Sequence, residues 1–219
     1  MVSWRVRAVA VAIPVLLVAG CKTSGVQTTG DGAEPHATKG NEATARKELG
    51  QLKVAVPDPM TGYSREKYGP AWKDVDDNGC DTRNDILARD LSKVKKRDKC
   101  IVISGELHDP YAGKDIHFTK AHASEVQIDH VVPLALAWRM GAHEWTPDKR
   151  AHLANDPANL LAVWGRPNMQ KSDKGPSEWQ PQKSFQCTYA ERFIGVTYAY
   201  RLSVTRADRT ALQGMLDTC

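Results

Sequence analysis

Two short runs, Val126-Gln127-Ile128 and the apolar residues 160–163, constrain the fold of this chain most. Each run is long enough for a β-strand and too short for a helix of ordinary length. Pro133 follows the first run, and proline cannot donate to a β-ladder, so the first strand must end before it. The two runs therefore predict two short, buried strands.

Helical segments are predicted between the two runs, over residues 134–140 and 147–153, and the turn-forming residues 155–159 precede the second run. After the second run, a turn through Gly165 and Pro167 opens a polar helix that holds Asn168, Lys171 and Lys174. The order is strand, helical insertion, strand, helix. We expect an α+β fold.

Composition narrows the class of protein less than the pattern does. The 219 residues include 30 Lys and Arg against 26 Asp and Glu, a net charge of +4, and 41% are hydrophobic. These values exclude an acidic disordered chain and a polytopic membrane protein. The charge excess is too small to indicate nucleic-acid binding by itself.

The N-terminus has the features of an export signal. Arg5 and Arg7 precede an apolar run over residues 8–19, which is too short to span a bilayer. Val18-Ala19-Gly20-Cys21 is similar to a bacterial lipobox, which predicts a lipoprotein signal peptide over 1–20 and a lipid on Cys21. A plain signal peptide with an incidental cysteine is the alternative. We expect export, with the chain held on the outer face of the cell membrane by the lipid alone, or secreted.

Residues 21–56 are predicted to be a flexible tether, because few large apolar side chains occur in the stretch up to about residue 51. The folded domain is then expected over 57–219, with its core at about 126–180. Short helices are expected over residues 64–72 and 84–94, the latter followed by the basic run 95–99. That run is read as a solvated helix end or, alternatively, as a contact for a phosphate backbone. Residues 100–107 and 115–118 are expected to pair as a hairpin.

Four cysteines remain after Cys21, an even number that favours two disulfides in an exported domain. Residues 187–203 and 206–217 read as two helices of similar length, and an antiparallel helical hairpin returns its end to its start. This geometry predicts Cys187–Cys219, which leaves Cys80–Cys100. Free buried thiols are one alternative and a zinc site a weaker one, because the chain has no CxxC pair.

Residues 74–85 match the spacing of an EF-hand calcium loop, with Asp74, Asp76, Asn78 and Gly79 followed by Asp85. Cys80 lies inside the loop, and no clear pair of flanking helices is present. The segment is therefore read either as a calcium site or, preferably, as a capped turn tied by a disulfide.

The strand, strand, helix arrangement from Val126 to Trp179 resembles the HNH, or His-Me finger, nucleases. In that resemblance Asp129-His130 matches the first position of the HNH motif and Asn159 the middle position. Asn168 matches the last position, where the HNH motif itself has His. More narrowly, the stretch from Asp77 to Trp179 resembles the HNH group that includes the C-terminal domain of GmrSD-type restriction endonucleases. Four sequence segments carry this resemblance: Asn78-Gly79-Cys80-Asp81-Thr82-Arg83, Asp109-Pro110-Tyr111, Ile128-Asp129-His130-Val131-Val132-Pro133-Leu134 and Asn155-Asp156-Pro157-Ala158-Asn159-Leu160-Leu161.

The resemblance implies a ββα-metal core with a flanking hairpin and helices, and a metal-dependent endonuclease. His130 would be the general base, since imidazole accepts a proton at neutral pH. Asn159 would orient it or steady the turn. Asp129 and Asn168 would hold a divalent cation, Mg²⁺ before Mn²⁺ and Zn²⁺ last, because oxygen ligands suit Mg²⁺.

Lys171 and Lys174 would contact a substrate phosphate, and the expected substrate is DNA, with RNA as a second choice, cut by a monomer. Two other functions remain open: a catalytically silent surface lipoprotein that binds nucleic acid or an anionic polymer, and a structural lipoprotein without a ligand.

The placement of both Asp129 and His130 in one site raises a geometric difficulty. Neighbouring residues of a strand face opposite ways, so Asp129 or His130 should lie beyond the end of the ladder.

Overall fold

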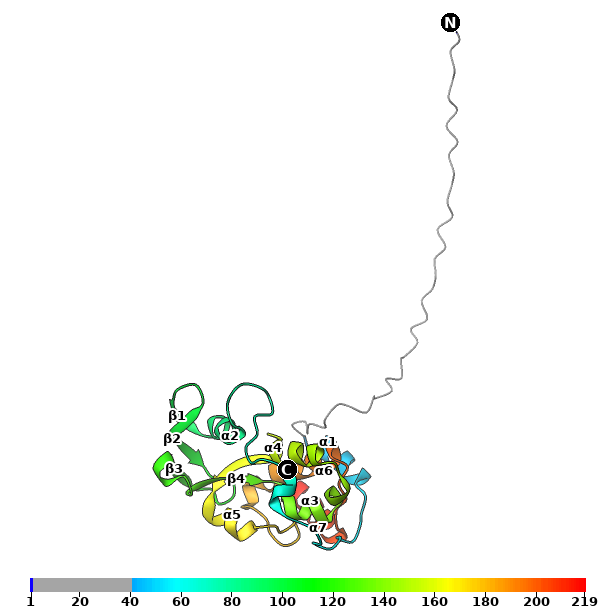
Figure 1. Ribbon diagram of the computed structural model, residues 1–219. Helices are drawn as coiled ribbons and strands as arrows, with labels where there is room; N and C mark the ends of the chain where they lie inside the picture. The colour runs from blue at the N-terminus through cyan, green and yellow to red at the C-terminus, as the bar shows by residue number, and fades with distance from the viewer. Residues whose placement is uncertain (2–40) are drawn as a thin grey trace. The chain divides into compact units, whose positions relative to one another are not determined.

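The structure is a computed structural model that describes residues 41–219 together with Met1 (Figure 1). The predicted signal peptide, Cys21 and most of the tether lie outside the described residues. Within the described part of the chain, no helix combines the length and the apolar character that a membrane span requires. The helices are α1 (Glu42–Gln51), α2 (Thr82–Asp90), α3 (Leu134–Arg139), α4 (Pro147–Asn155), α5 (Gly165–Lys171), α6 (Lys183–Ala199) and α7 (Arg206–Leu216), with three short 3-10 helices, η1 (Arg65–Tyr68), η2 (Lys120–His122) and η3 (Ala142–Glu144).

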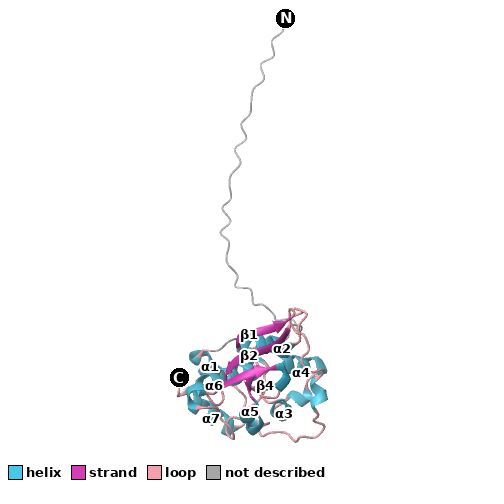
Figure 2. Ribbon diagram, turned by 90° about the vertical axis from the view of Figure 1, so that its left-hand side faces the viewer, coloured by secondary structure: helices cyan, strands magenta, loops and turns pink. Residues whose placement is uncertain are grey.

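Within residues 41–219, five strands form two antiparallel sheets. The first has the order β1-β2-β3 and contains β1 (Ser92–Arg97), β2 (Ile101–His108) and β3 (Asp115–Thr119). The second pairs β4 (Val126–His130) with β5 (Leu160–Trp164), in a register that places His130 opposite Leu160. In the view of Figure 2 the strands lie together, with α1, α6 and α7 on one side and α2 and α4 on the other. The predicted α+β class and the hairpin over 100–118 are confirmed.

The β4–β5 pair separates two apolar cores. Val126, Ile128, Leu160 and Ala162 pack with α2 and the three-stranded sheet. Leu161 and Val163, which alternate with them along β5, pack with side chains of the other helices. This alternation is what a strand buried on both faces requires. The second sheet is therefore fixed from both sides.

Both disulfides are present as predicted, Cys80–Cys100 and Cys187–Cys219. The second joins the start of α6 to the end of the chain after α7, as the helical hairpin requires. The structure thus has neither free thiols nor a zinc site at these four positions.

The tether predicted over 21–56 ends earlier than expected, because Glu42–Gln51 forms α1. The Asn41 side chain caps this helix by accepting a hydrogen bond from Thr44 N, and Ala45 and Leu49, one turn apart, are buried. α1 therefore packs against the domain through the buried side chains of Ala45 and Leu49, although its composition is mostly polar.

The helix predicted over 84–94 is also shorter than expected. Asp81 caps α2 through Asn84 N, and the helix ends at Asp90, so the basic run belongs to the edge strand β1 and is not a helix end. The predicted helix over 64–72 is reduced to the four residues of η1, and Ser64 makes no side-chain cap. Leu87, Leu91 and Val94 recur at helical spacing, but α2 ends at Asp90 and Val94 lies in β1, so this spacing predicted too long a helix.

α5 begins at Gly165 directly after β5, without the predicted intervening turn. A Cβ on Gly165 would lie 2.6 Å from Ser124 O, so only glycine permits this close approach. Pro167 falls in the first helical turn, where its missing N–H costs no hydrogen bond. These two residues bring α5 against the second sheet.

Candidate active site

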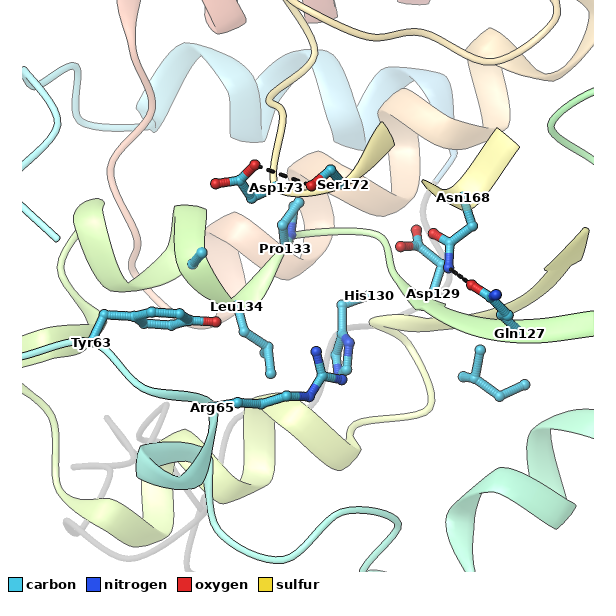
Figure 3. A pocket seen from close by; sticks show the side chains of 12 residues that line it. Tyr63, Arg65, Gln127, Asp129, His130, Pro133, Leu134, Asn168, Ser172 and Asp173 are labelled. Carbon is cyan, nitrogen blue, oxygen red and sulfur yellow. Dashed lines mark hydrogen bonds between the residues drawn. The ribbon is translucent and has the colours of Figure 1, made fainter. Parts of the chain in front are cut away.

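A cleft of about 350 Å³ lies at the end of β4. Figure 3 shows that β4 contributes Gln127, Asp129 and His130 and that the segment around η1 contributes Arg65. The other residues that line the cleft are Tyr63, Ile128, Pro133, Leu134, Ala135, Asn168, Ser172 and Asp173. Three predicted site residues, Asp129, His130 and Asn168, therefore share one cleft.

His130 is held by its surroundings in one orientation. Its ring is 7% exposed, and its Nε2 lies 2.9 Å from the carbonyl oxygen of Ala154 in α4. The Trp72 indole lies nearly parallel to the imidazole, with the ring centroids 6.5 Å apart and an interplanar angle of 13°. Since a carbonyl oxygen only accepts, Nε2 carries the proton and donates it to Ala154 O.

This hydrogen bond leaves the lone pair of the neutral imidazole on Nδ1. Burial lowers the pKa of His130 to about 3, and the positive charges of Arg65 and Lys171 act in the same direction, against the hydrogen bond to Ala154. His130 is therefore uncharged at neutral pH, with one basic nitrogen.

Asp129 lies in a buried network with Lys171 and Tyr111. Lys171 Nζ donates to Asp129 Oδ1 at 3.0 Å and lies 2.9 Å from Oδ2, and the Tyr111 hydroxyl donates to Oδ2 at 2.5 Å. Asp129 is 6% exposed and Lys171 fully buried. Burial raises the pKa of Asp129, and the Lys171 ammonium and the Tyr111 hydroxyl oppose that rise. Tyr111 and Lys171 thus compensate a carboxylate that would otherwise be costly to bury.

The structure does not place Lys171 to contact a phosphate, because its ammonium is buried against Asp129 and also donates to His130 O at 2.8 Å. The predicted i,i+3 relation to Asn168 is present, but that face of α5 packs on β4. Lys174 is exposed, donates to Gln170 O, and does not line the cleft.

Asn168 faces Gln127 across the cleft, and its Nδ2 donates to Gln127 Oε1 at 2.9 Å. This contact leaves Asn168 Oδ1 without a hydrogen-bond donor among the described residues. Asp129 Oδ1 accepts one bond and keeps a second lone pair. Carboxylate and amide oxygens converging on one cleft fit a hard divalent cation, which the sequence assigned to Asp129 and Asn168.

Asn159 is fully buried and steadies the loop after β4. Its Oδ1 accepts from Val132 N at 2.8 Å, and its Nδ2 donates to Val132 O and Leu153 O. Leu153 precedes Ala154, whose carbonyl holds His130. Of the two roles predicted for Asn159, this geometry favours the support of the turn, with an indirect effect on His130.

The expectation that Asp129 or His130 lies beyond the ladder was wrong, because β4 pairs with β5 through both residues. Asp129 faces α5, through Lys171, and His130 faces α4, through Ala154. Both line the cleft because it lies at the strand's end.

Tyr111, Arg65 and Trp72, which contact Asp129, line the cleft and stack on His130 respectively, were not predicted from the sequence as residues of the site. The sequence did contain a signal for Tyr111, since the motif Asp109-Pro110-Tyr111 is part of the family resemblance described above. Asp109 has a structural role in this motif, because its side chain accepts hydrogen bonds from Ala112 N and Trp164 N and so ties the turn to β5. Arg65 and Trp72 carry no local signal of this kind.

The described chain is thus an α+β domain in which His130, Asp129 and Asn168 line one cleft at the end of a two-stranded sheet. Residues 81–215 match the family model described as GmrSD restriction endonucleases, C-terminal domain, and this chain belongs to that family. A relative from Arthroderma benhamiae, described as an uncharacterized secreted protein, is 42% identical over 180 residues, which is 81% of this chain and 85% of the relative. No solved structure matches the chain.

Proposed function

We propose that this protein is a metal-dependent HNH endonuclease that hydrolyses phosphodiester bonds of nucleic acid, DNA in the first place. The single observation that carries the proposal is the neutral His130, whose Nε2–H is bound to Ala154 O while its other nitrogen keeps a lone pair, in a residue that lines the same cleft as Asp129 and Asn168. In this proposal β4, β5 and α5 correspond to the ββα-metal core.

His130 acts as the general base through Nδ1. It takes a proton from water, the water oxygen bonds to phosphorus, and the bond from phosphorus to the 3′ oxygen breaks. The leaving 3′ oxygen takes a proton from solvent water, which gives a 5′-phosphate and a 3′-hydroxyl. A base with a pKa of about 3 is weak in the free protein. The negative charge of a phosphodiester in the cleft raises its proton affinity, so the base is strengthened when substrate is bound.

Asn168 and Asp129 would hold the divalent cation, with Mg²⁺ as the first choice and Mn²⁺ as the second. When bound, the cation supplies positive charge to the phosphate and to the leaving oxygen. Lys171 and Tyr111 act as positioning residues, because they fix the Asp129 carboxylate from below the cleft. Lys171 is thus proposed for this role in place of a substrate contact.

Arg65 is proposed as the contact for the substrate phosphate. It is exposed, lines the cleft, and makes no hydrogen bond or ion pair with any described residue. The segment that carries it is anchored at both ends: Ala55 N donates to Val204 O, and the Tyr68 hydroxyl donates to Leu134 O. A guanidinium presented by a fixed segment binds a phosphate with two parallel hydrogen bonds.

Export is proposed from the N-terminal pattern, with support from the description of the fungal relative as secreted. Two disulfides fit an oxidising compartment. A lipid on Cys21 is proposed from the lipobox alone. Intact-mass measurement of the protein from membranes of its host tests it: a diacylglyceryl adduct on a chain beginning at Cys21 is expected, and an unmodified thiol there would exclude the anchor.

Plasmid nicking tests the activity, in Mg²⁺ and in EDTA, for the wild type, His130→Ala and His130→Gln. The Gln variant keeps an N–H where His130 Nε2 bonds Ala154 O and lacks the base. We expect cutting in Mg²⁺ by the wild type only. Cutting that survives both substitutions would contradict the base assignment. DNA binding without any cutting would favour the catalytically silent binding protein.

A further inference from the structure

A second hollow, of about 350 Å³, lies outside the proposed active site, between α2 and the three-stranded sheet (Figure 1). Its floor is apolar and is formed by Leu87 of α2, Val102 of β2 and Phe118 of β3, which are all buried. Ligand sites in proteins occupy roughly 300–1,000 Å³, so this hollow, called the α2 hollow below, is large enough to take a small ligand group.

Trp72 separates the α2 hollow from the cleft. It lines the hollow, and its indole lies nearly parallel to the imidazole of His130, which lines the cleft, with the ring centroids 6.5 Å apart. The hollow and the cleft are therefore neighbours across this pair of rings.

The backbone at Trp72 is strained. Its φ is +61°, in the left-handed region that a bulky side chain rarely adopts. Thr82, the first residue of α2, holds the segment there: its backbone N donates to Trp72 O at 3.3 Å and its hydroxyl donates to Lys73 O. Backbone strain of this kind persists only where the surrounding structure enforces it, and it is concentrated at functional sites. The α2 hollow thus has a strained aromatic residue at its border.

Arg83 supplies a positive charge to the α2 hollow. Its Cζ lies 6.0 Å from the centroid of the Trp72 ring, and its Nη2 donates to Ala123 O and Val126 O. The side chain is half-buried and forms no ion pair with a described residue, and Nε and Nη1 have no hydrogen-bond partner among these residues. Burial lowers the pKa of Arg83, against the charge of Asp81. A half-buried guanidinium without a carboxylate partner favours an anion beside it.

Lys120 supplies a second positive charge. It is exposed, lines the α2 hollow, and makes no hydrogen bond or ion pair with a described residue. Asp81 is the acid that lines the hollow, and its carboxylate caps α2 by accepting hydrogen bonds from the backbone N and from Nδ2 of Asn84. The positive charges therefore exceed the negative ones at the rim.

We propose that the α2 hollow binds a nucleotide of the substrate near the scissile phosphodiester, with Arg83 and Lys120 on its backbone phosphate and its base against Trp72 and the apolar floor. The chemistry of the hollow selects this occupant, because cations bind the phosphate and aromatic and apolar surface binds any base. The inference rests on the proposed function, since the same strand would occupy the cleft.

The distances allow one strand to reach both places. The His130 ring and the Arg83 guanidinium each lie within 6.5 Å of the Trp72 ring centroid. Successive nucleotides of a B-form strand are about 3.4 Å apart along the helix axis, so a few nucleotides span from the cleft to the hollow.

The test measures binding apart from cutting. Fluorescence anisotropy of a labelled single-stranded DNA of about 20 nucleotides is followed in EDTA, at several salt concentrations, for the wild type, Lys120→Gln and Arg83→Gln. Lys95→Gln is the matched control, because it removes the same charge from an exposed position of β1, outside the hollow. Circular dichroism checks that each variant is folded. Lys120→Gln keeps the test decisive if Arg83→Gln is unstable, since Lys120 makes no hydrogen bond that the substitution would remove.

Lys120→Gln is expected to raise Kd about 3- to 10-fold and Arg83→Gln about 10- to 100-fold, because each loses a charged contact to phosphate. For Lys120→Gln the slope of log K against log salt should fall by about 0.7, the value for one phosphate contact on a single strand. Lys95→Gln should change Kd by no more than about 2-fold, since salt screens an exposed charge outside the site. An unchanged Kd in Lys120→Gln, or an equal rise in Lys95→Gln, would overturn the proposal.

Plasmid nicking by the same proteins separates this proposal from the proposed function. If the wild type binds DNA without cutting it, and Lys120→Gln weakens binding as expected, the nucleotide site is supported and the nuclease is contradicted. If the wild type cuts DNA while the Lys120 and Arg83 variants bind as tightly as it does, the nucleotide site alone is overturned. A wild type that binds no DNA in EDTA would also overturn the nucleotide site, whatever the nicking assay shows.

Discussion

Lys171 Nζ lies 2.9–3.0 Å from both carboxylate oxygens of Asp129, and the two side chains are buried together beneath the cleft. The pair joins α5 to β4, the helix and the strand that carry Asn168 and His130. Its integrity therefore affects the stability of the domain as well as the geometry of the site.

Lys171→Met is expected to destabilise the domain by about 3–5 kcal/mol, because it leaves the Asp129 carboxylate buried without its cation. Urea unfolding monitored by circular dichroism measures this. The double variant Asp129→Asn/Lys171→Met should recover at least half of the loss, since it removes both charges. Lys174→Met, on the exposed side of the same region, is the control and should change stability by no more than about 0.5 kcal/mol. A cost below about 1 kcal/mol for Lys171→Met would argue against a buried ion pair.

Arg65→Gln is expected to lower kcat/KM for DNA about 10- to 100-fold, mainly through a higher KM, because a charge-assisted contact to phosphate is lost. Its unfolding free energy should be unchanged within about 0.5 kcal/mol, since Arg65 is exposed. Lys67→Gln removes the same charge from the same 3-10 helix, outside the cleft, and is the matched control. If both substitutions reduce activity equally, only the general positive charge matters and the specific contact is refuted.

Features set by local patterns could be predicted from the sequence. Val126 to Ile128, which ends before Pro133, and the apolar run Leu160 to Val163 read as strands. The Cys187–Cys219 pair followed from the lengths of two helices, and Cys80–Cys100 followed by elimination. The β4–β5 pair places Asp129 and His130 at the end of the sheet, and α5, which follows β5 directly, brings Asn168 to the same cleft.

Features set by distant segments could not be predicted. The burial of Lys171 depends on how α5 packs on β4, and helical spacing gives only the face on which a side chain lies. Arg65 lines the cleft and Trp72 stacks on the His130 ring, both from segments more than 55 residues before His130, and no periodicity relates them to it. α1 was missed because its polar composition conceals two buried residues, Ala45 and Leu49.

The stability of the wild type should fall as pH falls from 6.5 towards 4.5. The folded pKa of His130 is about 3 and the unfolded value about 6.5, so between these limits only the unfolded chain takes up the proton. The contribution of neutral His130 to the unfolding free energy is complete above pH 6.5, and acidification reduces it by about 1.4 kcal/mol per pH unit. Urea unfolding of the wild type and His130→Gln at pH 7.5 and 4.5 measures it. The wild type should lose roughly 2–3 kcal/mol more than the variant; equal losses would show that His130 titrates normally.

Asn159→Ala should separate support of the turn from catalysis. It leaves Val132 N and the carbonyls of Val132 and Leu153 without their buried partner, which should cost about 2–4 kcal/mol. Because Ala154 O then loses its fixed position, His130 is less well oriented, and kcat should fall about 10- to 100-fold with KM little changed. Asn155→Ala, in the same turn, is the control, since its Nδ2 bonds only within α4, to Ala151 O. Equal kcat in Asn159→Ala and the wild type at a temperature where both are folded would leave Asn159 with a structural role alone, whereas a loss as deep as that of His130→Ala would indicate direct participation.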